Sequence, residues 1–296
     1  MNANLYQDWI GRTETVSDVA TAQAVRAFRA TLDQTVFDTE EGDPLPPGAH
    51  WIFARPVAPM RALGRDGHPA RGPFLPPIAL PRRMWAGSRI EFGAPLRVGD
   101  RLERVSEILS ITPKTGSTGE LVFVTLRHTT GGSSGGKVVE QQDLVYRHDP
   151  QPGAGTAAGA ASAAKAPAVA RALAEDPGPA EFSRRVVPDT VLLFRYSALT
   201  FNGHRIHYDQ EYVTRVEGYQ GLVVHGPLLA TLMLDLIGRE MPAASIASFE
   251  FSARRPITLP MAFEVKARRD AGGRACRLWI ESEQGVAVAG RVGLRE

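Results

Sequence analysis

The chain has 296 residues, of which 43% are apolar and 22% charged, and its formal net charge is +2 at pH 7. This length and apolar content are enough for a large single core or for two domains of ordinary size, and they exclude intrinsic disorder as a class. The 34 basic and 32 acidic side chains nearly balance, without the basic excess of proteins that follow phosphate backbones. We therefore expect no nucleic acid partner.

Cysteine content and the N-terminus bear on the compartment. The single cysteine, Cys276, cannot form an internal disulfide and leaves no zinc-ligand spacing, so neither an oxidising compartment nor a structural metal is indicated. The N-terminus has no basic stretch followed by an apolar run, and no segment approaches the ~20 apolar residues that span a bilayer. The sequence therefore predicts a cytoplasmic protein without a membrane partner.

The first 81 residues contain one regular pattern and one irregular region. Apolar residues recur at helical spacing over residues 18–33, with Asp18 as a possible cap, which predicts one amphipathic helix. Residues 43–81 are rich in proline and glycine, and only residues 48–54 form a compact apolar piece. This region is expected to be loop with one short buried element.

The hydrophobic period changes to two between residues 86 and 147. Strands are predicted at residues 88–92, 101–111, 121–129 and 138–146, and glycine-rich breaks such as residues 115–119 and 131–136 are typical of turns. These strands should pair as an antiparallel meander in a curved sheet.

The second half begins after a stretch dominated by alanine, glycine and proline, residues 150–180, which predicts a linker. Residues 227–238 are apolar on nearly every side and too short to span a membrane, so they predict a helix wrapped by sheet. Pro227 suits the first turn of that helix. Further strands are expected at residues 245–251, 261–267, 275–283 and 286–293.

The two halves correspond weakly in sequence. Leu102 follows Pro95 at the same spacing as Phe263 follows Pro256, and each copy continues with a strand, a turn and a final strand. A tandem duplication explains this pattern better than one large unrepeated sheet. We therefore predict an α+β double hot-dog: an N-terminal copy over 1–149 that supports the pocket, the linker over 150–180 and a catalytic copy over 181–296.

Polar groups concentrate in the segment 194–209, directly after an apolar run, and His225 with Gly226 and Pro227 follows at the start of the buried helix. Hydration of a conjugated thioester requires a base that activates water and donors aimed at the oxygen where enolate charge collects. Histidine suits the proton transfer near neutral pH. The free N–H groups of a helix N-terminus supply such donors, and Gly226 would allow a close approach.

These residues carry a family resemblance. The run from Tyr196 to His207 resembles the hydratase 2 motif of MaoC-like enzymes, a Tyr-x-x-Leu-Ser/Thr-Gly-Asp-x-Asn-Pro-Ile-His pattern. Residues 200–209 and 223–228 are more similar to the branch that contains type 2 hydroxyacyl-thioester dehydratases and the mesaconyl-C4-CoA and itaconyl-CoA hydratases. Residues 80–87 and 95–100 also look like that branch, so the resemblance covers most of the chain.

The resemblance implies roles for individual residues. His207 falls on the motif's catalytic histidine and Asn202 on its catalytic aspartate, while Phe201 replaces the preceding glycine. A carboxamide can hold water through its oxygen but cannot accept its proton, so we assign His207 as the base and Asn202 as the water orienter. The candidate substrate-binding residues are Tyr196, Gly203, His204, Arg205, His225, Gly226 and Pro227.

Other polar residues have competing interpretations. We interpret four histidines as ordinary structural residues: His50, His68, His128 and His148. No His-Glu-x-x-His pattern accompanies the histidines of the motif, so we predict no metal site. Arginines could pair with the phosphates of coenzyme A, although we favour a position on the solvated surface for each arginine considered. These arginines are Arg82, Arg83, Arg89, Arg254 and Arg255. The run 114–119 favours a hairpin turn over a phosphate-binding loop.

The resemblance implies a hydro-lyase that acts on a branched C5 dicarboxylic acyl-CoA, mesaconyl-C4-CoA first and itaconyl-CoA second. Coenzyme A would be part of the substrate, no cofactor would be needed, and a homodimer is possible. Three alternatives stay open: a 3-hydroxyacyl-thioester dehydratase of fatty acid synthesis, a non-catalytic acyl-thioester-binding module, and a hot-dog thioesterase.

Overall fold

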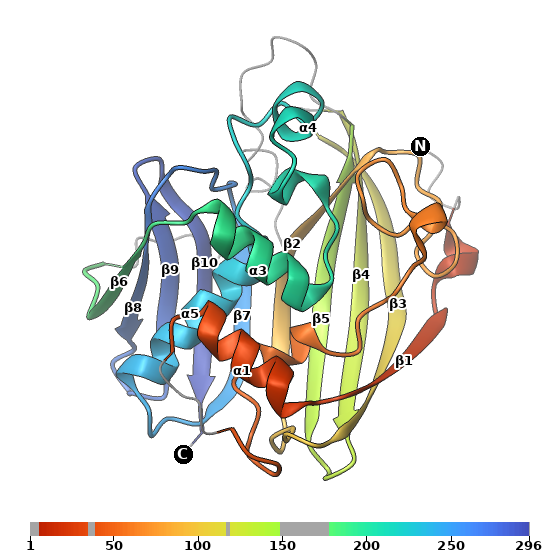
Figure 1. Cartoon of the computed structure of the whole chain (residues 1–296). Helices are drawn as coiled ribbons and strands as arrows, with labels where there is room; N and C mark the ends of the chain where they lie inside the picture. Colours follow the sequence, from red (N-terminus) through yellow and green to blue (C-terminus); the bar gives the residue numbers. More distant parts are fainter. Residues whose placement is uncertain (1–5, 35–38, 117–118, 149–177, 296) are drawn as a thin grey trace. The chain divides into compact units, whose positions relative to one another are not determined.

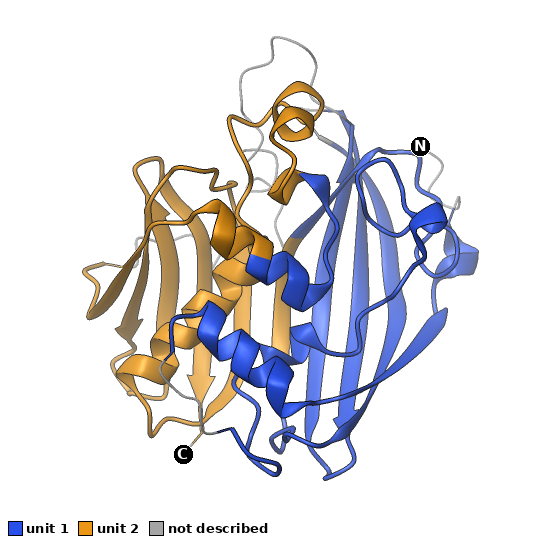
Figure 2. Cartoon of the chain, viewed as in Figure 1, with its two compact units in different colours: residues 1–85, 92–149, 195–205 blue, residues 86–91, 150–194, 206–296 orange. Residues whose placement is uncertain are grey.

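A computed structural model describes residues 6–34, 39–116, 119–148 and 178–295. The chain divides into two compact units (Figure 2). Unit 1 holds residues 1–85, 92–149 and 195–205, and unit 2 holds residues 86–91, 150–194 and 206–296. The predicted linker lies almost wholly outside the described residues, and the domain bounds drawn from the sequence stay a prediction.

Unit 1 contains an antiparallel meander. Its strands β3 (Arg101–Gly116), β4 (Gly119–Gly132) and β5 (Lys137–Arg147) follow one another in sheet order, and β1 (Thr13–Val19) pairs with β3 (Figure 1). The predicted meander is confirmed for the strands at 101–111, 121–129 and 138–146, each of which is longer than its apolar alternation indicated. The strand predicted at 88–92 is not part of it, because it belongs to β2 (Arg82–Phe92), which is not a neighbour of β3 in the sheet order. The short helices η1 (Gln7–Trp9), η2 (Ala49–Ile52) and η3 (Met60–Ala62) lie in the connecting segments.

The predicted helix over residues 18–33 is shorter than expected. Helix α1 spans Ala22–Thr31, and Thr21 caps it by accepting the N–H of Ala24 at 3.3 Å. Asp18 belongs to β1, where its carboxylate accepts the N–H of Ala54 at 2.9 Å. Every second residue of β1 is only half-buried, so this strand lacks the apolar alternation that marks a strand in sequence.

The core of unit 1 lies on one face of the meander and includes residues from the loop region. Apolar side chains of β3, β4 and β5 pack there against Ile78 and Leu80, which come from the proline-rich segment. The buried members are Tyr6, Ile78, Leu80, Ile108, Ile111, Val122, Val124, Leu126, Leu144 and Tyr146. This packing holds a segment that would otherwise have few constraints.

Unit 2 contains antiparallel strands of its own. Residues 87–91 of β2 (Arg82–Phe92) pair with β7 (Ile246–Ala253), followed by β10 (Gly285–Leu294), β9 (Ala275–Ser282), β8 (Phe263–Arg269) and β6 (Phe182–Val186). The four strands predicted after residue 245 are confirmed, with bounds that differ by a few residues. The stretch 182–201 divides into β6 and helix α3 (Thr190–Thr200).

Helix α5 (Gly226–Glu240) is the central helix of unit 2, and it contacts β6, β8 and β9. All residues from Leu228 to Ile237 are buried, as expected for a helix that is apolar on nearly every side. The buried Asp235 is paired with Arg184 at 2.6 Å and Arg239 at 2.8 Å, which satisfies the charge in the core. None of the described helices is long and apolar enough to cross a membrane.

Candidate active site

The polar motif starts where α3 ends, and its first residues close the helix. The N–H of Asn202 donates to the carbonyl of Ser197 at 2.9 Å and the N–H of Phe201 to that of Ala198 at 3.3 Å, with Phe201 at φ 50°. This is a Schellman motif, in which a left-handed residue, usually glycine, ends the helix. This helix end explains why the general motif has glycine at this position. Phe201 adopts the same left-handed conformation under strain.

Asn202 forms an Asx turn directly after this helix end. Its Oδ1 accepts the backbone N–H of His204 at 3.0 Å. Because that N–H can donate only to an oxygen, the contact also fixes which end of the carboxamide is the amine. The oxygen that we expected to hold water is therefore already engaged once, and the Nδ2 group is the end left for a ligand.

The loop of residues 64–68 lies against the motif within unit 1. It is a tight turn, in which the N–H of Gly64 donates to the carbonyl of His68 at 2.7 Å. The carbonyl of Asp66 accepts the N–H of Arg205 at 2.9 Å, and the Arg205 guanidinium donates to the carbonyl of Arg65 at 3.2 Å. One backbone and one side-chain hydrogen bond of Arg205 thus join the proline-rich region to the motif.

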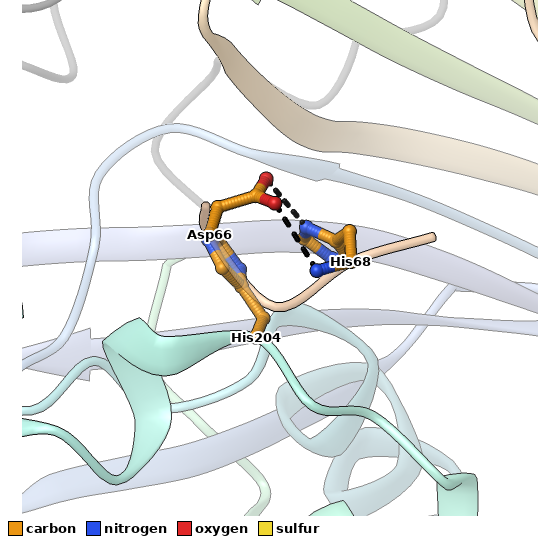
Figure 3. Close-up of side chains that lie close together, drawn as sticks. All are labelled: Asp66, His68 and His204. Atoms are coloured by element: carbon orange, nitrogen blue, oxygen red, sulfur yellow. Dashed lines mark hydrogen bonds and ion pairs between the residues drawn. The ribbon is translucent and has the colours of Figure 1, made fainter. Parts of the chain in front are cut away.

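This loop brings Asp66 and His68 next to His204 (Figure 3). The Asp66 carboxylate accepts from the backbone N–H of His68 at 3.1 Å and contacts Nδ1 of its ring at 3.0 Å. The rings of His68 and His204 lie 4.0 Å apart between centroids, tilted by 39°. The sequence placed His204 in the site but interpreted His68 as structural, since neither its spacing nor its neighbours marked it.

Charge and burial set the protonation of this pair. Burial, with the charge of Arg83 next, lowers the pKa of His68 to about 4. Burial acts to raise the pKa of Asp66, but the hydrogen bond and charge of His68 outweigh it and the pKa falls to about 2. At neutral pH, Asp66 is ionised and His68 is neutral.

The same three side chains offer nitrogen and oxygen atoms that all lie within 4.8 Å of one another. That spacing would suit a divalent cation. However, the carboxylate is already hydrogen-bonded to His68, and the positive charge of Arg83 is close enough to shift the pKa of both partners. Nearby positive charge disfavours a cation, so we assign no metal to this cluster.

In unit 2, His207 ends the short helix η5 (Arg205–His207) and its ring is buried. Its Nδ1 contacts the carbonyl of Val223 at 2.7 Å. A carbonyl only accepts, so Nδ1 carries the hydrogen and Nε2 presents a lone pair. This is the tautomer that a general base requires.

His225 and the start of α5 lie beside His207 in the same unit. The two imidazoles are stacked, with centroids 3.5 Å apart, and His225 is fully buried. Burial, with the charge of His207, lowers the pKa of His225 well below 6.5, so His225 stays neutral. A Cβ atom on Gly226 would meet nothing within 4 Å, which leaves the first turn of α5 open to a ligand.

The remaining candidates have structural partners. Tyr196 is fully buried in α3, where its carbonyl accepts the hydroxyl of Thr200 at 2.7 Å. Asp209 caps the helix α4 (Gln210–Arg215) by accepting the N–H of Tyr212 at 2.9 Å. Of the arginines considered for phosphate binding, Arg254 and Arg255 are adjacent in unit 2, and burial, then the charge of Arg255, lowers the pKa of Arg254.

Comparison with known proteins places this site in a family. The family model for hydroxyacyl-thioester dehydratase type 2 matches residues 48–259, which include the loop at 64–68 and the whole motif. The chain belongs to this family. It is 44% identical over 269 residues to the mesaconyl-C(4)-CoA hydratase of Chloroflexus aurantiacus, which covers 90% of both chains.

More distant relatives agree with this assignment. The mitochondrial hydroxyacyl-thioester dehydratase type 2 of Schizosaccharomyces pombe is 28% identical over 262 residues, 80% of each chain. A Mycobacterium tuberculosis protein described as a double hot-dog fold superposes with a TM-score of 0.58 at 15% identity, covering 96% of both chains. The predicted double hot-dog fold is thereby confirmed.

Proposed function

We propose that the chain adds water to the double bond of a short dicarboxylic acyl-CoA, with mesaconyl-C4-CoA as the first substrate and itaconyl-CoA as the second. The product would be citramalyl-CoA. The observation that carries this proposal is the 44% identity to a mesaconyl-C(4)-CoA hydratase over 90% of both chains. Coenzyme A is the handle of the substrate, and the reaction needs neither a redox cofactor nor a metal.

His207 is the base in this mechanism. Its Nε2 takes a proton from water as the water oxygen bonds to the β-carbon, and the double-bond electrons move toward the thioester oxygen. The imidazolium then returns the proton to the α-carbon, so one histidine completes the addition. The N–H of Gly226 is suited to stabilise the enolate oxygen, because the first turn of a helix leaves such donors unpaired.

The decisive assay is a panel of enoyl-CoA thioesters, followed by loss of the conjugated-thioester absorbance and by product masses that gain one water. His207→Ala should lose about 10² to 10⁴ in turnover, the usual contribution of a positioned acid or base. Exposed His148, which the mechanism does not use, provides the control His148→Ala. If folded His207→Ala kept the rate of the unmodified protein, the base would lie elsewhere, with Asp209 and His225 the next candidates.

Arg205 tests the choice of a dicarboxylic substrate. We propose that its guanidinium binds the free carboxylate, although it also donates to the carbonyl of Arg65. Losing one charged hydrogen bond costs roughly 1.5 to 3 kcal/mol, so Arg205→Ala should lose dicarboxylic substrates selectively. If turnover of crotonyl-CoA fell as much, Arg205 would have a structural role only.

The same assay separates the other classes. A fatty acid dehydratase, favoured by the 28% identity to the mitochondrial enzyme, would prefer longer apolar acyl chains. A thioesterase would release free thiol, and a binding module would retain acyl-CoA unchanged. A homodimer is a separate proposal, which the molar mass of the protein in solution tests.

A further inference from the structure

His207 needs more than its hydrogen bond to present Nε2 in one direction. Its Nδ1 donates to the carbonyl of Val223 at 2.7 Å, which fixes the tautomer and holds one edge of the ring. A hydrogen bond at one edge still permits the ring to turn about that contact. A base transfers a proton efficiently only when its lone pair is held toward the reacting group, so a contact on the face of the ring matters as well.

His225 supplies this contact from within unit 2. The two imidazoles are stacked, with centroids 3.5 Å apart and an angle of 18° between their planes. A nearly parallel contact at this distance prevents the His207 ring from turning out of its plane, because the turned ring would collide with its neighbour. His207 is thus held at its edge by Val223 and on its face by His225, two residues further along the chain.

The segment that makes both contacts is itself fixed. His225 is the N-cap residue of α5 and is fully buried. The N–H of Val223 donates to the carbonyl of Ile206 at 2.9 Å, and the N–H of Val224 donates to the carbonyl of Ile257 at 2.8 Å. The stacking surface therefore belongs to a hydrogen-bonded backbone at the start of a buried helix, and it can hold another ring in place.

The charges within the pair assign the proton to His207. Burial, then the charge of His207, lowers the pKa of His225 well below 6.5. The titratable group that faces His225 in the stack is His207, on η5, and two protonated rings at this distance would repel each other. His225 therefore offers a flat surface without competing for the proton that His207 takes from water.

We propose that His225 is a positioning residue for the base: its ring stacks on that of His207 and, together with the carbonyl of Val223, fixes the direction of the Nε2 lone pair. This inference rests on the proposed function. His225 takes no proton and forms no bond in the reaction, since the proton moves from water to His207 and from there to the α-carbon. Its contribution is to kcat, because the direction of the base matters for the chemical step more than for binding of the acyl-CoA.

Three substitutions at residue 225 separate stacking from proton transfer. His225→Ala removes the ring. His225→Phe keeps a flat ring that carries no nitrogen to take a proton, and His225→Gln offers a smaller planar amide in case the phenyl ring is too large for this buried position. His50→Ala is the control, because His50 is also a buried histidine packed against an aromatic ring, that of Trp51 at 4.8 Å between centroids, and the mechanism does not use it.

The measurement is kcat and KM of the full chain with mesaconyl-C4-CoA across pH, with circular dichroism to confirm folding. We expect His225→Ala to lower kcat about 10- to 100-fold with little change in KM, as for a misdirected catalytic group. His225→Phe and His225→Gln should recover part of this loss, and their rates should still fall at acid pH as His207 is protonated. His50→Ala should keep full kcat.

Each outcome bears on a different proposal. If the unmodified protein turns over substrate and folded His225→Ala matches its kcat, the inference is wrong and the proposed function stands. A loss in folded His225→Phe and His225→Gln as large as in His225→Ala would also overturn it, because a stacking surface would then not matter. Disappearance of the acidic limb in these variants would identify His225 as the base instead. If the unmodified protein hydrates no enoyl-CoA, the proposed function fails and the inference fails with it.

Discussion

The carbonyl oxygen of Gly203 lies so close to Gly67 that a Cβ atom on residue 67 would clash with it. Gly67 has φ +84°, which L side chains rarely adopt. Both constraints require glycine, and together they let the loop at 64–68 reach the motif. The placement of Asp66 and His68 next to His204 depends on this contact between two backbones.

Gly67→Ala should therefore reduce turnover as well as stability. The methyl group must push the loop away from Gly203, which disturbs the hydrogen bonds that join Arg65 and Asp66 to Arg205 in the motif. Gly11→Ala is the matched control, since Gly11 has φ +81° and no atom within 4 Å of an added Cβ. Backbone strain alone should cost each variant roughly 1 to 2 kcal/mol. Equal kcat in the two variants would show that the clash does not reach the site.

Regular elements were largely predictable because their apolar residues repeat at a fixed period. Strands β2 to β5 and β7 to β10 and helix α5 were found this way, with ends that differ by as much as six residues, 82 against 88 at the start of β2. The short strand β6 was not predicted. Strand β1 was missed, and residue 18 was assigned to a helix, because five of its seven residues are polar and its side chains alternate only between half-buried and exposed. Pairing with β3 decides the conformation of β1, and the residues of β3 lie about 90 residues away in the chain.

The candidate site was predictable only where its residues are close in sequence. His207, His204 and Asn202 lie within six residues, and His225 precedes a recognisable helix. Asp66 and His68 lie in a proline-rich loop about 130 residues before the motif, with no periodicity to mark them. Their contribution depends on tertiary contacts, chiefly the Gly67 contact, which a single sequence does not reveal.

Phe201→Gly should stabilise the protein. Phe201 ends α3 at φ 50°, and the residue is 60% exposed, so removal of its side chain loses little packing. Relief of the left-handed strain should raise the free energy of unfolding by about 1 kcal/mol, which the urea midpoint would report. Phe201→Ala keeps the Cβ atom and should show no such gain. A gain of equal size in the alanine variant would mean that the aromatic ring, not the backbone, is the source of strain.

The stability of the fold should fall between pH 6.5 and pH 4. The pKa of His68 and that of His128 are both about 4 when folded, against 6.5 in the unfolded chain, chiefly because of burial. The unfolded state therefore binds more protons in this window, so full stability is present above pH 6.5 and is lost as pH falls toward 4. Each histidine should contribute roughly 2 to 3 kcal/mol.

The pH dependence can be assigned with single variants. In His68→Asn and in His128→Asn, denaturant unfolding between pH 6.5 and pH 4 should show a shallower slope than in the unmodified protein. Asp66 titrates at lower pH than the two histidines. Its pKa is about 2 in the folded chain against the ordinary 3.8, so its contribution to the free energy of unfolding is lost only as pH falls from 3.8 toward 2. A slope that neither histidine variant changes would mean that both rings protonate in the folded state.

Asn202→Asp should keep measurable activity and change the pH dependence of turnover. The new carboxylate can still accept the N–H of His204, so the Asx turn is retained. It also adds a titratable group to the motif, so the acidic limb of the rate profile should move. The measurement is kcat across pH for Asn202→Asp and for the unmodified protein, with circular dichroism to confirm folding. An unchanged pH profile would mean that the group at residue 202 takes no part in the proton transfer.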